Sequence, residues 1–334
     1  MRRAAGLGLI LAVLAAAALA GPPAHGQSPV AGPLQVEAEP VAMDPAHPDA
    51  DRAGPFRYAG GLVLKGPRER GFGGLSDLRI GPGGALTAVT DQGGLLRARI
   101  VLDQKGRLTG FEDAALEPLT DQAGKPLEGK LDADSEGLAI WPNGDLMVSF
   151  ERRHRIWLYP ARGGPPRSLP IPTIEMPPNQ GLEGLSTAPS RGPGAYWAGV
   201  EGGSVWLCRK TRACVRWRGM PGPGFGCRLS ALTEAPGRRL VILHHCYNPI
   251  TGSSRVRVEV VAIPTRPADT APIQAELKIA TPMTVDNLEG VAAGPAPKGG
   301  LRLYLLSDDN FSDDQRTLLL AFDLPPARKS PRRR

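Results

Sequence analysis

The chain has 334 residues, 41% of them apolar, and a formal net charge of +7 at pH 7. This length and apolar content are enough for one large folded domain or two ordinary ones, and they exclude a chain that is disordered throughout. Two positive charges lie at the N-terminus and five more lie in the last seven residues, so the body is nearly neutral and we expect no nucleic-acid partner.

The first 20 residues have the pattern of a secretory signal peptide. Met1-Arg2-Arg3 precedes a run of small and apolar residues that ends in Ala18-Leu19-Ala20, a typical cleavage site. A membrane anchor would need about 20 apolar residues, and this run is short and rich in alanine. We therefore expect a periplasmic or secreted protein with no membrane anchor after cleavage. A Pro/Ala/Gly-rich segment over residues 21–56 is expected to be mostly flexible.

A Glu-Gly step with an apolar residue behind it recurs along the rest of the chain. Aligning the chain on this step gives one residue per unit, at intervals of roughly 45 to 65 residues, which is the range of repeat architectures. This first column consists of Gly73, Glu136, Glu183, Ser230 and Glu289.

Each unit continues with short apolar runs of strand type, separated by turns rich in Gly, Pro or Asn. With 42 Gly and 35 Pro in the chain, long helices are not expected. Four short antiparallel strands per unit are typical of a propeller blade. The sequence thus predicts an all-β fold, a β-propeller of five or six four-stranded blades over residues 57–325, with a disordered basic tail over residues 326–334. Residues 57–64 precede the first unit and are predicted to supply the outer strand of the last blade, which closes the ring.

Four cysteines in an exported protein indicate two disulfides, although the sequence alone allows three pairings. Cys208 and Cys214 flank a turn between the third and fourth strands of one blade. Cys227 lies just before the first strand of the next blade and Cys246 just after its second strand, where an antiparallel hairpin brings the two together. The blade register therefore predicts the pairs Cys208–Cys214 and Cys227–Cys246.

The second strand of each blade ends at a polar residue, and these residues form a second column. In a propeller the start of the first strand and the end of the second lie at the same mouth of the central channel, so the two columns should converge there. Clustered carboxylates repel one another unless a cation joins them, and their oxygens are the ligands that calcium or magnesium prefers. We expect calcium, and a water that it activates as nucleophile. The second column is Asp91, Glu151, Glu201, His245 and Asp308.

These columns supply the candidate site residues. Arg152 and Arg153 directly follow Glu151 and are candidates for binding substrate phosphate, together with His245. The alternative for each repeated acid is a structural bond to the backbone of a neighbouring blade. The chain has no Gly-x-Ser-x-Gly, phosphate-loop or His-Glu-x-x-His motif, so the usual serine-hydrolase, nucleotide and zinc-protease chemistries lack support. The candidate catalytic residues are Glu136, Glu151, Glu183 and Asp91, and the candidate metal ligands are Glu289, Asp308 and Asn287.

The combined motifs resemble the bacterial phytase-like family, which is labelled "esterase-like activity of phytase". The resemblance covers roughly residues 57–325. It implies an exported β-propeller with phosphoesterase activity, and by position it points to Asp91, Glu136, Glu151, Glu183, Glu289 and Asp308. The motifs that carry it are Gly71-Phe72-Gly73-Gly74-Leu75-Ser76, Asp134-Ser135-Glu136-Gly137, Ser149-Phe150-Glu151, Asn179-Gln180-Gly181-Leu182-Glu183-Gly184 and Ser307-Asp308-Asp309-Asn310-Phe311.

Three functions remain open at this point. The first is a metal-dependent phosphoesterase that acts on a small phosphomonoester or phosphodiester. The second is a calcium-dependent lactonase or carboxylesterase of the gluconolactonase-like propeller type, whose ion would be held by Asn287, Glu289 and Asp308. The third is a propeller that binds a ligand without catalysis. In each case we expect a monomer.

Overall fold

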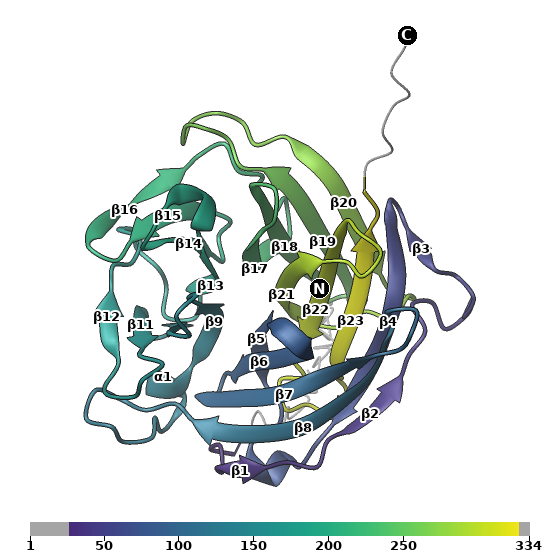
Figure 1. Ribbon diagram of the computed structural model, residues 1–334, viewed down its shortest axis with the longest axis horizontal. Helices are drawn as coiled ribbons and strands as arrows, with labels where there is room; N and C mark the ends of the chain where they lie inside the picture. Colours follow the sequence, from purple (N-terminus) through teal and green to yellow (C-terminus); the bar gives the residue numbers. More distant parts are fainter. Residues whose placement is uncertain (1–26, 327–334) are drawn as a thin grey trace, which may run out of the picture.

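Five antiparallel sheets surround a central axis in the computed structural model, which describes residues 27–326 (Figure 1). The inner strands β5, β9, β13, β17 and β21 contact one another in a closed ring. The predicted all-β propeller is confirmed, and it has five blades. The predicted signal peptide and residues 327–334 of the predicted tail lie outside the described residues.

Each blade has four antiparallel strands, which in the first four blades follow chain order from the axis outward. The first blade contains β5 (Leu75–Ile80), β6 (Ala85–Thr90), β7 (Gly94–Leu102) and β8 (Leu108–Pro118). The second contains β9 (Ser135–Ile140), β10 (Leu146–Phe150), β11 (Arg155–Tyr159) and β12 (Arg167–Leu169). The third contains β13 (Leu182–Thr187), β14 (Ala195–Val200), β15 (Val205–Arg209) and β16 (Arg212–Trp217). The fourth contains β17 (Cys227–Ala235), β18 (Arg239–Asn248), β19 (Ser253–Ala262) and β20 (Ile273–Ala280).

The fifth blade joins the two ends of the propeller. Its first three strands are β21 (Leu288–Pro295), β22 (Leu301–Ser307) and β23 (Thr317–Leu324), and its fourth strand is β4 (Phe56–Lys65) from the N-terminal side. The pairing of β23 with β4 runs from Thr317 opposite Leu64 to Asp323 opposite Arg57. The prediction that residues 57–64 close the ring is therefore confirmed.

The segment before β4 was expected to be mostly flexible, but from residue 27 onward it lies against the blades. Strand β1 (Gly32–Pro33) pairs with β8, and both β2 (Glu37–Pro40) and β3 (Arg52–Ala53) pair with β4. These pairs cover the outer edges of the first and fifth blades. Four short helices complete the described elements: η1 (Arg68–Arg70), η2 (Pro82–Gly84), η3 (Pro189–Arg191) and α1 (Lys130–Ala133). No helix within residues 27–326 is long and apolar enough to cross a membrane.

An ion pair fills the centre of the channel. The guanidinium of Arg79 on β5 donates to the Asp77 carboxylate at 3.0 Å, and the same carboxylate accepts the backbone N–H of Leu138 on β9 at 2.9 Å. Arg79 also donates to backbone carbonyls on each of the other three inner strands, at Leu185, Leu232 and Val291. One ion pair thus links all five inner strands across the axis of the propeller.

Both predicted disulfides are confirmed, Cys208–Cys214 in the third blade and Cys227–Cys246 in the fourth. Cys227 is directly opposite Cys246 in the pairing of β17 with β18. Between the blades, apolar side chains from facing sheets form the core. Trp197 and Trp217 of the third blade meet edge to face at 5.1 Å between ring centroids, and they belong to one apolar cluster with Leu232 and Leu240 of the fourth blade. The apolar packing joins neighbouring blades around the mouth, and each disulfide cross-links two strands within one blade.

Candidate functional site

A cavity of about 120 Å³ lies at the mouth of the channel and is lined almost entirely by charged or amide side chains. The predicted convergence of the two columns is what the structure shows, because members of both columns line this one cavity. Seven carboxylates take part, together with two cations and two amides. The residues are Asp91, Glu136, Glu151, Glu183, Glu201, Glu289 and Asp308, with Lys130, Arg228, Asn179 and Asn310.

The first-column acids are aimed at the cavity by β-bulges. In each blade the pairing of the inner strand with its neighbour shifts register around the column residue, as at Glu183 between Leu182 and Gly184. A bulge inserts one extra residue and re-aims its side chain. In the first blade the shift lies between Leu75 and Asp77, so the equivalent residue is Ser76, and the predicted alignment on Gly73 was wrong by three residues. The corrected column is Ser76, Glu136, Glu183, Ser230 and Glu289.

The glycine that follows each column glutamate is required by close packing between blades. A Cβ atom on Gly137 would lie 2.9 Å from the backbone oxygen of Glu183, and one on Gly184 would lie 3.0 Å from the backbone nitrogen of Leu232. Both atoms belong to the inner strand of the next blade. The recurring Glu-Gly step therefore combines a side chain for the cavity with the space that the neighbouring strand needs.

The second-column residues are fixed by their own backbone. The N–H of Glu151 donates to the carbonyl of Asp134, and the N–H of Glu201 donates to that of Gly181, which lies two residues before Glu183. Asp91 and Asp308 make the equivalent bonds. The end of each second strand is thereby tied to the start of the first, which places both acids of a blade at the same mouth.

Two cations lie among the carboxylates. Lys130 on α1 forms ion pairs with Asp91 at 2.5 Å and with Asp134 at 2.6 Å. On the opposite side, Arg228 pairs with Glu201 at 3.3 Å and with Glu289 at 3.4 Å. Although burial acts to lower the pKa of both cations, the surrounding carboxylates raise it above its ordinary value, so both remain charged.

The carboxylates between these cations hold their protons more tightly than usual. Burial, followed by the charge of neighbouring acids, raises the pKa of Glu136, Glu183 and Asp308 well above its ordinary value. For Glu151, burial and the charge of Asp134 raise the pKa to about 7. Without an added cation, the cavity therefore cannot keep all of its acids ionised at neutral pH.

The donor set fits a hard divalent cation. Asp134, Glu136 and Glu151 each offer an oxygen within 4.8 Å of the others, and so do Glu151, Glu183 and Glu201. All of these ligands are carboxylate oxygens, which suit calcium or magnesium rather than softer metals. Glu136 forms no ion pair with Lys or Arg among residues 27–326, and neither does Glu183. The mouth thus carries a cluster of carboxylates whose spacing could hold a metal ion.

The predicted arginines lie beside the cavity rather than in it. Arg152 donates from Nε to Asp134 at 2.7 Å, and Arg153 pairs with Asp132 at 2.7 Å on the exposed surface. His245 is buried next to the cavity, 3.3 Å from the hydroxyl of Ser254. It lines an adjoining cavity of about 370 Å³ that shares Arg228 with the acidic one.

Asn287 also lies in this adjoining cavity. Its amide is engaged, since Nδ2 donates to Glu289 at 2.8 Å and Oδ1 accepts from Arg228 at 3.4 Å. Asn287 thus orients Glu289, and Glu289 and Asp308 both line the acidic cavity itself. The set Asn287, Glu289 and Asp308 is therefore divided between the two cavities.

The sequence did not point to Lys130 or Arg228. Arg228 occupies the position two residues before the first column, where the other blades have Gly74, Asp134, Gly181 and Asn287. A signal for it existed in the fourth blade, where Ser230 replaces the acid and an arginine appears nearby. Lys130 precedes the second blade on the short helix α1, outside any repeated position.

A family model described as "Phytase-like: Esterase-like activity of phytase" matches residues 70–311. No curated protein matches the chain significantly. Among solved structures, virginiamycin B lyase from Staphylococcus aureus is 12% identical, with 87% of this chain and 100% of that chain covered and a TM-score of 0.40. The major allergen Mala s 1 of Malassezia sympodialis is 14% identical over 82% of this chain and 91% of that chain, with a TM-score of 0.43. A protein of unknown function from Dyadobacter fermentans is 13% identical over 89% and 97%, with a TM-score of 0.41.

Proposed function

Because this chain belongs to the phytase-like family, we propose that it is an exported, metal-dependent phosphoesterase that acts at the acidic cavity on a phosphomonoester or phosphodiester. The observation that carries the proposal is the juxtaposition of two carboxylate triads with Lys130 and Arg228 in one cavity. Carboxylates alone would repel a phosphate, whereas carboxylates with a bound cation and two fixed side-chain cations can bind it.

The triads Asp134–Glu136–Glu151 and Glu151–Glu183–Glu201 would hold the cation, with calcium as the ion we favour. When bound, such an ion supplies positive charge for phosphate oxygens and lowers the pKa of a water molecule. Asp134 is buried and held by Lys130 and Arg152, so it also fixes the geometry of its neighbours. Glu289 and Asp308 complete the acidic wall on the far side.

Lys130 and Arg228 would bind and orient the phosphoryl group from opposite sides of the cavity. Both side chains are anchored by carboxylates, which limits the conformational freedom lost on binding. Glu151 belongs to both triads, so it would be the ligand that the two share. Asp91 positions Lys130 through the ion pair at 2.5 Å.

Export is supported by the two disulfides, which persist in oxidising compartments such as the periplasm or the extracellular space. The signal-peptide pattern of residues 1–20 is consistent with this location. We propose that the mature protein acts there as a monomer on a small-molecule ester.

The proposal is tested with the purified mature protein by elemental analysis of bound metal, followed by hydrolysis assays with and without chelator. We expect stoichiometric divalent cation, hydrolysis of 4-nitrophenyl phosphate or bis(4-nitrophenyl) phosphate, loss of activity with chelator, and recovery with calcium. Hydrolysis of gluconolactone but of no phosphoester would establish the lactonase alternative. Metal binding without hydrolysis of any ester would instead identify a binding propeller.

A further inference from the structure

Next to the acidic cavity lies an exposed apolar surface on the same mouth. Phe225 and Ile250 are the two most exposed large apolar side chains within residues 27–326, at 104% and 94%, and Tyr247 is 57% exposed. We call Phe225 and Tyr247 the apolar rim, because both line one outer cavity. Single exposed apolar residues are common, but two that line the same cavity indicate a binding surface.

The apolar rim is connected to the acidic cavity through shared lining residues. Arg228 lines both the acidic cavity and the adjoining cavity of about 370 Å³. Tyr247 in turn lines both that cavity and an outer one of about 540 Å³, which Phe225 also lines. The three spaces therefore adjoin one another in series, from the carboxylates to the apolar rim.

The chemistry changes in steps along this path. Next to Arg228 the middle cavity offers the neutral polar groups of Ser254, Asn287 and His245. Burial and the charge of Arg228 lower the pKa of His245 to about 4, so its imidazole is uncharged at neutral pH. The outer cavity adds aromatic and aliphatic surface, together with Arg255, whose planar guanidinium can stack on an aromatic ring.

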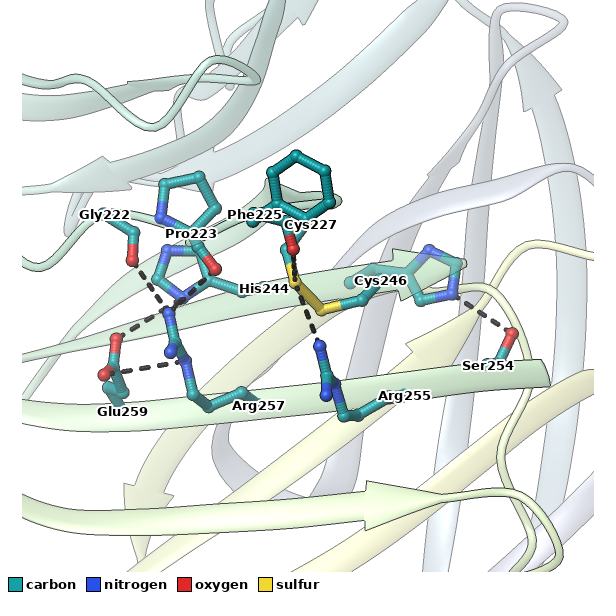
Figure 2. The surroundings of a disulfide bond; sticks show 11 residues. Gly222, Pro223, Phe225, Cys227, His244, Cys246, Ser254, Arg255, Arg257 and Glu259 are labelled. Atoms are coloured by element: carbon teal, nitrogen blue, oxygen red, sulfur yellow. Dashed lines mark hydrogen bonds and ion pairs between the residues drawn. A yellow bond between two sulfur atoms is a disulfide. The ribbon is translucent and has the colours of Figure 1, made fainter. Parts of the chain in front are cut away.

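The loop that carries Phe225 is fixed at both ends. Arg257 donates to the carbonyls of Gly222 and Pro223 at 2.8 and 3.0 Å, and it is itself held by the buried Glu259 (Figure 2). On the other side, Cys227 is bonded to Cys246 (Figure 2). The exposed ring is therefore presented on an anchored loop, which reduces the entropic cost of using it for binding.

We propose that the substrate is an ester with a single phosphoryl group whose other half carries an aromatic ring that lies on the apolar rim. This inference rests on the phosphoesterase function proposed above. A polyphosphorylated compound fits poorly, because its additional phosphates would meet either the remaining carboxylates or, beyond Arg228, the neutral groups of the middle cavity. An aromatic ring matches the apolar rim, and a short polar linker matches the neutral groups between them.

The test compares 2-phenylethyl phosphate with ethyl phosphate, two alkyl esters that differ by the ring. In the wild-type protein we expect kcat/KM to be about tenfold higher for the phenylethyl ester, in keeping with burial of one aromatic ring. The kcat/KM for the phenylethyl ester should also exceed the kcat/KM for inositol hexakisphosphate. The double variant Phe225→Ala/Tyr247→Ala should lose this preference through KM while retaining its activity on ethyl phosphate. Ile273→Ala, an exposed apolar residue on β20 away from the path, should change neither.

Calorimetric binding of 2-phenylethylphosphonate and ethylphosphonate separates this inference from the catalytic proposal. Tighter binding of the phenylethyl compound that Phe225→Ala/Tyr247→Ala abolishes would support the apolar rim even in a protein that hydrolyses neither ester. Equal kcat/KM for the two esters, or equal loss of both in the variant, would overturn the inference and leave the phosphoesterase standing. A change in oligomeric state in the variant, with the ester preference intact, would identify the rim as a self-association surface and also overturn it.

Discussion

Seven carboxylates and two cations line the acidic cavity, and this imbalance determines what each residue can do. Asp91, Glu201 and Glu289 each have a cation within 3.4 Å. Glu136 and Glu183 lie between the two cations. Burial, and next the charge of neighbouring carboxylates, raises the pKa of both side chains. These two glutamates are therefore the acids that gain most from an added divalent ion.

Replacing Glu136 with Gln should remove the divalent site without unfolding the protein. Gln keeps the shape of the side chain but not its charge, so we expect loss of metal binding and a fall in kcat/KM of more than about 100-fold, since loss of an outer-shell partner alone costs 10–100-fold. In the presence of chelator the Tm should be equal to or higher than that of the wild type, because a repelled carboxylate is removed. Glu117→Gln, on the exposed face of β8, serves as control. Unchanged metal content in Glu136→Gln would contradict the site, and a large drop in Tm would indicate a structural role.

The metal-free protein should lose stability as pH rises. The pKa of Glu151 is raised to about 7, so the folded state binds more protons than the unfolded state, whose carboxyl has its ordinary pKa. The stability from this group is complete below the unfolded pKa and is lost as pH rises through about 7. We expect the Tm in chelator to fall between pH 5 and pH 8, and calcium to raise the Tm more at pH 8 than at pH 5. A calcium effect that is equal at both values would contradict proton–metal competition.

Much of the site could be predicted because each column position repeats with the blade. The cations could not, because Arg228 stands at a repeated position where no other blade has a cation, and Lys130 lies outside the repeat. The register of the first blade was wrong because Gly73-Gly74-Leu75-Ser76 imitates the repeated step three residues too early. A bulge is defined by the pairing of two strands, and the sequence of one strand does not reveal it.

Among the elements, the hairpin of β17 and β18 links the frame to the site most directly. Cys227 at its start is adjacent to Arg228, and its partner Cys246 is adjacent to His245. The other disulfide lies on the outer strands β15 and β16 of the third blade. Both pairs were predictable, because an antiparallel hairpin fixes which residues face each other.

The two disulfides should therefore differ in their effect on activity. The sequence separation is 19 for Cys227–Cys246 and 6 for Cys208–Cys214, so loop closure predicts stabilisation of about 3 kcal/mol for the first and about 2 kcal/mol for the second. Cys227→Ser/Cys246→Ser should lower the free energy of unfolding and also raise KM, because Arg228 loses its anchor. Cys208→Ser/Cys214→Ser should lower stability less and leave KM unchanged. Urea unfolding and steady-state kinetics of both variants measure this, and an equal change in KM would contradict the link.

For the molecule as a whole, the ion pair of Asp77 and Arg79 adds direct hydrogen bonds between the inner strands of different blades. Each blade is a local sheet. No covalent bond closes the ring of blades, and the hydrogen-bonded pairing of β4 with β23 closes it instead. The central pair adds hydrogen bonds from one strand to the other four. This role was not evident from sequence, since it depends on five segments meeting at one point.

Arg79→Met should be strongly destabilising, by about 3–5 kcal/mol, because it leaves Asp77 buried and uncompensated. Burial raises the pKa of Asp77 to about 6 even with Arg79 present. The double variant Asp77→Leu/Arg79→Met should recover part of this loss, since apolar replacement of a whole buried pair is often tolerated. Urea unfolding of both variants provides the measurement, and a double variant that is no more stable than Arg79→Met would contradict the expected recovery.

The same central pair also gives the molecule a single entrance. Arg79 crosses the axis below the acidic cavity, so the central channel is open at the mouth and closed beneath the cavity. A ligand that reaches the carboxylates has to leave by the opening through which it came, past any molecule waiting to enter. A polymer cannot pass through a channel that is closed in this way. Only a free end or a side group of a polymer can reach the acidic cavity. Ligand binding and ligand release therefore use the same opening, and a ligand that dissociates slowly prevents the next one from binding.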